Sequence, residues 1–163
     1  MRRSSNGAER ERAVDWTLRK AVPADRERIG ELFLAMLRSV CRTADVKGYE
    51  EGYLDRFFDG GEDWICVAQG RDGVLAYLSI EAHRETEDRL YLDDLSVAAP
   101  YRGAGIGTAL LRRAEDYARE LGVPAVVLHV ERANTGARRL YERLGYRALR
   151  GEGSRLLMGK TVF

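Results

Sequence analysis

The segment "YLDDLSVAAPYRGAGIGTALL", residues 91–111, places two adjacent aspartates and an apolar stretch ahead of three glycines at alternate positions. Arg89–Val97 is predicted to be the third strand of a meander, after two apolar-rich strands at 64–68 and 74–82. Apolar residues at helical spacing over Gly105–Leu121, followed by Gly122 as a C-terminal stop, predict a helix. The glycines are therefore expected in a loop that joins a strand to a helix.

That loop has the features of an anion-binding site. Arg102, Gly105 and Gly107 form the pattern R-x-x-G-x-G at the entrance to the predicted helix. Glycine lets the backbone approach a ligand, and the free N–H groups of a first helical turn favour negative charge by about 0.3–1 kcal/mol. The expected ligand is a phosphate group.

Two common glycine-rich motifs do not match this loop. A P-loop would carry Gly-Lys-Ser/Thr, but Thr108 follows Gly107 directly. A dinucleotide-binding fold would place its glycines after the first strand, and this loop lies two-thirds along the chain. A tight turn without a ligand is the remaining alternative, although it would account for one glycine more readily than for three glycines and Arg102.

The rest of the chain predicts one α/β domain over residues 14–163, after a flexible tail at residues 1–13. Alternating or continuous apolar runs indicate strands, and apolar residues at helical spacing indicate helices. The expected strands lie at 14–19, 64–68, 74–82, 89–97, 125–130, 146–150 and 155–162, and the expected helices lie at 49–58, 105–121, 134–144 and over about 17 residues from Pro23. The order is β-α-α-β-β-β-α-β-α-β-β, a mixed sheet of about seven strands flanked by four helices.

Composition excludes several classes of protein. The 163 residues are 45% apolar and 33% charged, which suits one domain with a substantial core. Two cysteines and two histidines are scattered along the chain, so neither a disulfide framework nor a metal site is expected. The polar start and the lack of a run of about 18 apolar residues predict no secretory signal and no membrane span, hence a cytoplasmic location.

Charge is distributed unevenly along the chain. The net charge of +1 argues against nucleic-acid binding, but residues 44–94 hold 5 basic against 14 acidic side chains and residues 95–163 hold 12 against 6. The middle of the chain is therefore expected to face something cationic and the last third something anionic. Solvated helix faces of different composition are the alternative.

Two segments resemble the GNAT acetyltransferase superfamily. "LSVAAPYRGAGIGTALL" (95–111) is similar to its acyl-CoA signature, Q/R-x-x-G-x-G/A, and "NTGARRLYERLGYR" (134–147) is similar to its later motif of Asn, a helix carrying Tyr, and Gly-Phe/Tyr. The resemblance extends from about Val14 to Val162. It implies the GNAT acyl-CoA N-acyltransferase fold, with acetyl-CoA as cofactor.

The resemblance also implies roles for particular residues. The strand edge at Leu95 and Val97 would pair with the pantetheine arm, and Asn134 would hydrogen-bond it. Tyr141 would protonate the departing CoA thiolate; a buried tyrosine with a satisfied hydroxyl is the alternative. Since Asn134 and Tyr141 are two helical turns apart, both can face one groove. The pyrophosphate would be held by the loop residues Arg102, Gly103, Ala104, Gly105, Ile106, Gly107 and Thr108.

An acidic pair stands where an amine would be deprotonated. An alkyl amine has a pKa of about 10, so at neutral pH it arrives as an ammonium and must lose a proton before attack. Adjacent strand residues face opposite sides, so only one of Asp93 and Asp94 should line the site unless a bulge re-aims the other. "YLDDLSV" resembles the "YLED" of spermidine/spermine acetyltransferases, with the acid at Asp93, and the "YDLAV" of some aminoglycoside acetyltransferases, with the acid at Asp94. The two aspartates rank equally, and a solvated or loop-capping acid is the alternative for each.

The resulting hypothesis is an N-acetyltransferase that moves an acetyl group from acetyl-CoA to a primary amine of a cationic small molecule, such as a polyamine or an aminoglycoside, by direct attack. Tyr49, Glu50 and Tyr53 of the acidic segment, together with Asp93, are expected to frame this substrate. A protein N-terminal or lysine acetyltransferase, with an open groove beside the last hairpin, and a non-catalytic acyl-CoA-binding sensor are the alternatives. Homodimers are common in that family, but the sequence does not indicate a surface for one.

Overall fold

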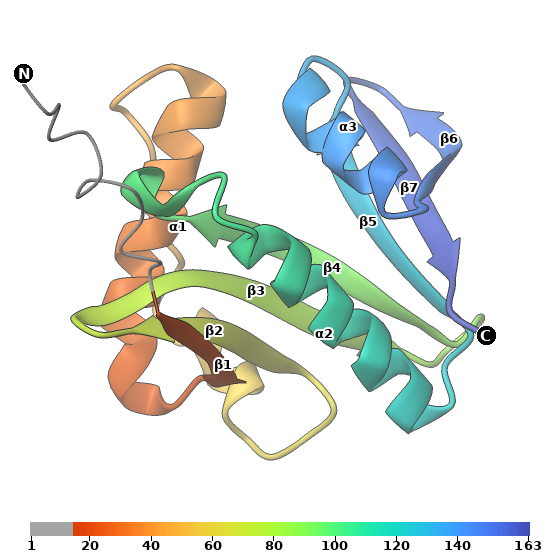
Figure 1. The fold of residues 1–163 in the computed structure, drawn as a ribbon, viewed down its shortest axis with the longest axis horizontal. Helices are drawn as coiled ribbons and strands as arrows, with labels where there is room; N and C mark the ends of the chain where they lie inside the picture. Colours follow the sequence, from red (N-terminus) through yellow and green to blue (C-terminus); the bar gives the residue numbers. More distant parts are fainter. Residues whose placement is uncertain (1–14) are drawn as a thin grey trace, which may run out of the picture.

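The computed structural model describes residues 15–163, so the predicted tail and Val14 lie outside the described residues. Seven strands form one sheet in the order β1-β2-β3-β4-β5-β7-β6 (Figure 1). Only β4 and β5 run parallel, and the other neighbours are antiparallel, so the predicted mixed sheet is confirmed. The strands are β1 (Trp16–Lys20), β2 (Trp64–Gly70), β3 (Gly73–His83), β4 (Arg89–Val97), β5 (Ala125–Glu131), β6 (Arg147–Glu152) and β7 (Arg155–Thr161).

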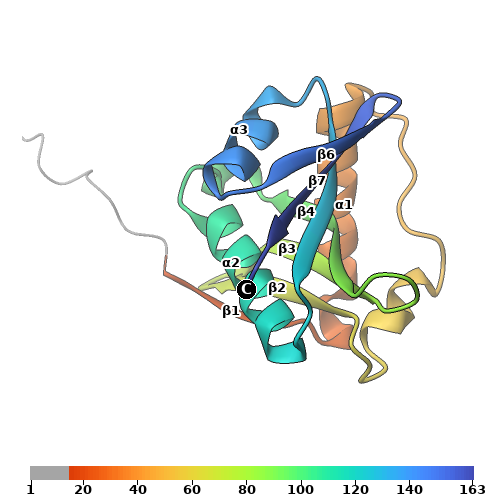
Figure 2. The same cartoon turned by 90° about the vertical axis from the view of Figure 1, so that its right-hand side faces the viewer.

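Helices cover both faces of the sheet. Figure 2 shows α1 on one side of the strands and α2 with α3 on the other. Strand alternation divides the core accordingly: Tyr77 of β3 packs with α1, whereas its neighbours Ala76 and Leu78 pack with α2. The α-helices are α1 (Arg26–Cys41), α2 (Ile106–Leu121) and α3 (Thr135–Arg143). None of the helices in residues 15–163 has the length and apolar character that crossing a membrane requires.

The predicted count of four helices is wrong by one. In place of the predicted α-helix at 49–58, the chain has only a short 3-10 helix, η2 (Tyr53–Phe57). The reason lies at Gly52, whose φ of +79° is left-handed, so a right-handed helix cannot continue from Tyr49 through this position. Two further 3-10 turns, η1 (Pro23–Asp25) and η3 (Ala99–Tyr101), precede α1 and the glycine loop.

The sheet opens between β4 and β5. Their pairing runs from Arg89 with Ala125 to Leu92 with Leu128, and no further pair joins the two strands within residues 15–163. β5 nevertheless stays paired with β7 as far as Glu131. The last residues of β4 therefore have a free edge toward β5, and this opening positions the site.

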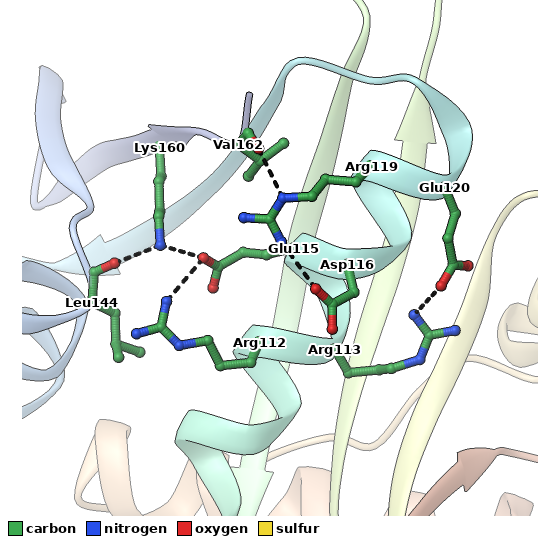
Figure 3. Close-up of polar contacts among 9 residues, drawn as sticks. All are labelled: Arg112, Arg113, Glu115, Asp116, Arg119, Glu120, Leu144, Lys160 and Val162. Atoms are coloured by element: carbon green, nitrogen blue, oxygen red, sulfur yellow. Dashed lines mark hydrogen bonds and ion pairs between the residues drawn. The ribbon is translucent and has the colours of Figure 1, made fainter.

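A buried ion pair ties α3 and β7 to α2 (Figure 3). The Lys160 ammonium contacts the Glu115 carboxylate and donates to the Leu144 carbonyl, 2.8 Å away, at the C-terminal end of α3. Glu115 is completely buried, and Arg112 approaches its Oε1 at 3.3 Å. One lysine thus links the helix that follows the glycine loop to the helix that carries Tyr141.

Candidate active site

The glycine loop leaves its backbone open at the start of α2. Gly103 and Gly105 have φ angles of +79° and +84°, and no atom lies within 4 Å of where a Cβ would stand at either position. No side chain caps the first turn of α2, so its N–H groups face the loop without a side-chain acceptor. Arg102 donates through Nε to the Val97 carbonyl at 3.1 Å, which fixes the loop to the end of β4. The loop has the geometry of an anion cradle.

A cleft of about 900 Å³ lies in front of this loop, between the diverging ends of β4 and β5. Eleven of the predicted site residues line it: Asp93, Leu95, Val97, Arg102, Gly103, Gly105, Ile106, Gly107, Thr108, Asn134 and Tyr141. Ala104, Asp94, Tyr49, Glu50 and Tyr53 are not part of the lining. The cleft also receives His129 from β5 and Met36 from α1.

Gly105→Ala is expected to raise the KM for acetyl-CoA, the cofactor that the sequence resemblance implies, by about 10-fold or more, because a side chain disfavours the left-handed φ that aims the loop N–H groups. Gly60 provides a matched control, since its φ is also +84°, with open space around the missing Cβ. Gly60→Ala should cause similar strain and leave this KM unchanged. Steady-state kinetics and urea unfolding of both variants measure the two effects, and equal KM values would contradict the role of the loop.

Asn134 and Tyr141 reach the cleft from α3. Asn134 is the N-cap of this helix, and its Oδ1 accepts from the Ala137 N–H at 3.2 Å. Burial raises the pKa of Tyr141 to about 12, so its hydroxyl is protonated at neutral pH. The Tyr141 ring packs edge to face against Tyr146, with centroids 6.0 Å apart. Tyr141 therefore presents a protonated phenol, packed against Tyr146, in the wall of the cleft.

A β-bulge coincides with the two aspartates. β3 pairs Leu78 with Leu95 and Ile80 with Leu92, so two residues of β4 stand opposite the single residue Ser79. Asp93 is exposed and lines the cleft. The Asp94 N–H donates to the Ser79 hydroxyl at 2.9 Å, and its carboxylate is directed to the Tyr49 hydroxyl. The bulge therefore brings both aspartates to the α1 side of the strand, where Asp93 opens to the cleft and Asp94 contacts Tyr49.

Asp94 is held by a pair of tyrosines. The Tyr49 hydroxyl donates to Asp94 at 2.6 Å and lies 2.8 Å from the Tyr77 hydroxyl. Burial raises the pKa of Asp94 to about 6, although the hydrogen bond from Tyr49 acts in the opposite direction. Burial likewise raises the pKa of Tyr49 and Tyr77 well above the usual range. This carboxyl consequently binds a proton more tightly in the folded protein than in the unfolded chain.

Asp94→Asn is expected to remove a pH dependence of stability. Because burial raises the folded pKa from 3.8 to about 6, wild-type loses stability as the pH rises from about 4 to above 6. The loss is up to about 3 kcal/mol, and asparagine does not titrate. Urea unfolding of both proteins from pH 4 to 7 measures it. A constant difference between the two free energies of unfolding would contradict this expectation.

Aromatic side chains extend from Asp94 toward η2. Tyr49 stacks on Phe33 at 3.9 Å and on Tyr53 at 5.0 Å between centroids. Burial raises the pKa of Tyr53 to about 12, and the negative charge of Asp93 adds to this effect. Glu50 instead borders a separate hollow of about 370 Å³ beside α1, so the structure does not bring it to the main cleft.

A row of hydrogen-bonded polar side chains beside the cleft was not predicted from the sequence. The Tyr91 hydroxyl lies 2.7 Å from His129 Nδ1, and His129 Nε2 contacts the Glu152 carboxylate. His129 lines the cleft, although the sequence pattern shows it only as an interruption of an apolar strand. The signal for it was a single polar residue within the apolar run of residues 125–130, close to the end of the strand.

Comparison with known proteins identifies the family. The model of the "Acetyltransferase (GNAT) family" matches residues 31–146. The chain is 33% identical to streptothricin acetyltransferase of Streptomyces lavendulae, over 88% of this chain and 87% of that protein. It is 31% identical to N-acetylaspartate synthetase of Rattus norvegicus over 81% of this chain, but spans only 42% of that longer protein. The PaiA N-acetyltransferase of Thermoplasma acidophilum, solved in complex with coenzyme A, shares the fold at a TM-score of 0.73 and 18% identity, over 90% of this chain and 99% of that one. The chain belongs to the GNAT family of acetyltransferases.

Proposed function

We propose that this protein transfers an acetyl group from acetyl-CoA to a primary amine of a cationic small molecule. One observation carries the proposal: a single cleft joins an open anion-binding loop to a free strand edge, an exposed carboxylate at Asp93 and a protonated phenol at Tyr141. Membership of the GNAT family supports the reaction class. The overall similarity to a streptothricin acetyltransferase supports a small-molecule acceptor.

Different residues of the cleft would bind different parts of acetyl-CoA. The N–H groups from Arg102 to Thr108 would hold the pyrophosphate, because they are open and lie at the positive end of α2. The free edge of β4 at Leu95 and Val97 would pair with the pantetheine amides, and Asn134 would add a hydrogen bond. When bound, acetyl-CoA supplies an activated acetyl thioester.

Three side chains then have distinct tasks. Asp93 carries its negative charge at the surface of the cleft, where it attracts an ammonium group and orients it toward the thioester. Tyr141 donates its hydroxyl proton to the thiolate that leaves as the amide forms. Asp94 acts as a positioning residue, since it fixes Tyr49 and through it the aromatic wall next to Asp93.

The acidic surroundings favour a cationic acceptor. Asp93, Asp94 and Glu81 all contribute negative charge around Tyr53. Residues 44–94, which supply these groups, hold 14 acidic against 5 basic side chains. Such a field raises the local concentration of a cation and speeds its association, an effect that salt weakens.

A thiol-release assay with acetyl-CoA over a panel of polyamines, aminoglycosides, amino acids and peptides tests the proposal. We expect turnover of at least one free polyamine or aminoglycoside, with a kcat/KM that falls as salt is raised. Turnover restricted to peptides would instead support a protein acetyltransferase. Binding of CoA without turnover of any amine would support an acyl-CoA sensor and contradict the proposal.

A further inference from the structure

A second hollow, of about 390 Å³, opens between β1 at the edge of the sheet and α2, which packs over the middle strands (Figure 1). Its size is within the range of small-molecule sites, and among the described residues none lines both this hollow and the main cleft. We propose that this β1–α2 hollow binds a small organic carboxylate, in which the charged group is joined to an apolar body. The site goes beyond the proposed function and does not depend on it. Its lining includes Leu18, Lys20, Trp64, Cys66, Arg113 and Tyr117.

Apolar and aromatic side chains form much of the wall of the β1–α2 hollow. Leu18 of β1 and Cys66 of β2 line it from the sheet, and Tyr117 lines it from α2. The Tyr117 ring meets Trp64 edge to face, with centroids 5.3 Å apart, and its hydroxyl donates to the Glu62 carbonyl at 2.8 Å. Burial raises the pKa of the Cys66 thiol to about 11, so this group is neutral at pH 7. An apolar body would therefore lose contact with water here at little polar cost.

Trp64 brings a hydrogen-bond donor that the protein leaves unused. The residue is only 6% exposed, and its Nε1–H has no hydrogen-bond partner within residues 15–163. An indole N–H can only donate, and a buried donor without an acceptor is unfavourable. Since Trp64 also lines the hollow, we infer that an oxygen atom of the ligand accepts this hydrogen bond.

Basic side chains supply positive charge to the same hollow. The Arg113 guanidinium lies 5.3 Å from the centroid of the Trp64 ring, and its charge partly offsets the effect of burial on the pKa of Cys66. Lys20 is exposed and adds an ammonium. Arg19 also lines the hollow, but its guanidinium is hydrogen-bonded to two other side chains. Because the indole, guanidinium and ammonium groups only donate, the ligand that fits them is an anion.

Two acidic side chains of the loop before β2 also lie near the hollow. Glu62 and Asp63 add negative charge around Tyr117. Each of them is paired with an arginine at 2.9 Å, Glu62 with Arg84 and Asp63 with Arg56. These pairs offset most of the negative charge, so it should repel an anionic ligand only weakly.

Glu120 indicates that the anionic group is a carboxylate. Its Oε1 accepts from Arg113 Nη1 at 3.0 Å, on the side of α2 away from Glu115 (Figure 3). The planar guanidinium can hold both oxygens of a carboxylate, whereas Glu120 contacts it through one nitrogen. The Glu120 side chain is 56% exposed, and exposed ion pairs contribute little to stability. A ligand carboxylate would therefore compete with Glu120 for Arg113.

Proton–nitrogen NMR of the indole N–H tests the site without any turnover. The sequence has two tryptophans, so Trp16→Phe leaves the Trp64 indole signal alone in its region. Benzoate is expected to move this signal downfield, because the N–H gains an acceptor, with a Kd of about 1 mM or lower. Benzamide has nearly the same shape without the charge and should bind at least about 10-fold more weakly. Hexanoate carries the carboxylate on a flexible chain, so its affinity relative to benzoate identifies which apolar body the hollow prefers.

Two substitutions on α2 are expected to change the affinity for benzoate in opposite directions. Arg113→Gln should weaken binding by about 10-fold or more, because it removes the guanidinium. Glu120→Gln should tighten binding by about 3-fold, because it removes the competing carboxylate. Asp116→Asn removes an exposed carboxylate that pairs with Arg119 instead, and as the matched control it should leave the affinity within about 2-fold.

The outcomes that would overturn the inference are specific to this hollow. They are a Trp64 signal that stays in place up to about 10 mM benzoate, equal binding of benzamide and benzoate, and an affinity that neither Arg113→Gln nor Glu120→Gln changes. A repeat with saturating CoA keeps benzoate out of the anion-binding loop of the main cleft, and the Trp64 shift should persist. Loss of the shift with CoA would assign benzoate to the main cleft and would also overturn the inference.

Discussion

Tyr141→Phe is expected to lower kcat by about 10²- to 10⁴-fold, because it removes the hydroxyl that we propose as the proton donor for the thiolate, and little else. Phenylalanine keeps the ring that packs against Tyr146 and the apolar wall of the cleft. The affinity for CoA should therefore change by less than about 3-fold. Steady-state turnover with a reactive amine, together with calorimetric titration of CoA, measures both quantities on the same preparation.

The chain offers a closely matched control for this variant. Tyr146 is 1% exposed, its hydroxyl has no hydrogen-bond partner in residues 15–163, and it does not line the cleft. Tyr146→Phe removes the same atom from a neighbouring ring and should leave kcat within about 2-fold of wild-type. A wild-type kcat for Tyr141→Phe, or a loss of CoA affinity as large as the loss of rate, would contradict the assignment of Tyr141 as the acid.

The glycine loop and the α3 residues of the cleft could be predicted because their information is local. The glycine loop follows a strand and opens a helix, and both elements show in the periodicity of residues adjacent in the sequence. Asn134 and Tyr141 lie seven residues apart on one short helix, so their common face follows from helical geometry. The predicted helix at 49–58 failed for an equally local reason, since Gly52 adopts a left-handed conformation that helical spacing alone does not reveal.

The surroundings of Asp93 and Asp94 depend on contacts between residues far apart in the sequence, which spacing does not display. Asp94 meets Tyr49 across 45 positions, and His129 meets Glu152 across 23. The strand period left Asp93 and Asp94 equivalent. The bulge opposite Ser79 turns both to one face, and only their tertiary contacts show that Asp93 lines the cleft and Asp94 meets Tyr49. Register and strand order are tertiary properties, so neither the relation of the two acids nor the position of Glu152 could be predicted from spacing.

Lys160→Met is expected to cost about 3–5 kcal/mol of unfolding free energy, because it leaves the fully buried Glu115 carboxylate without its ammonium partner. Arg112 is 3.3 Å away but more than half exposed, so it should offset only part of this loss. Urea unfolding at neutral pH measures the cost. Asp116→Asn, which breaks an exposed pair with Arg119 on the same helix (Figure 3), should cost less than about 1 kcal/mol.

A double variant separates the effect of the unpaired Glu115 charge from the loss of Lys160 packing. Lys160→Met combined with Glu115→Leu should recover most of the lost stability, because an apolar pair removes the unpaired charge. It cannot restore the hydrogen bond from Lys160 to the Leu144 carbonyl at the end of α3. The double variant should therefore be stable yet show a lower kcat, since the end of the helix that carries Tyr141 is less firmly held. If stability and kcat instead recover together, Lys160 acts only as a counter-charge to Glu115, and the position of Tyr141 depends on the packing of α3 alone.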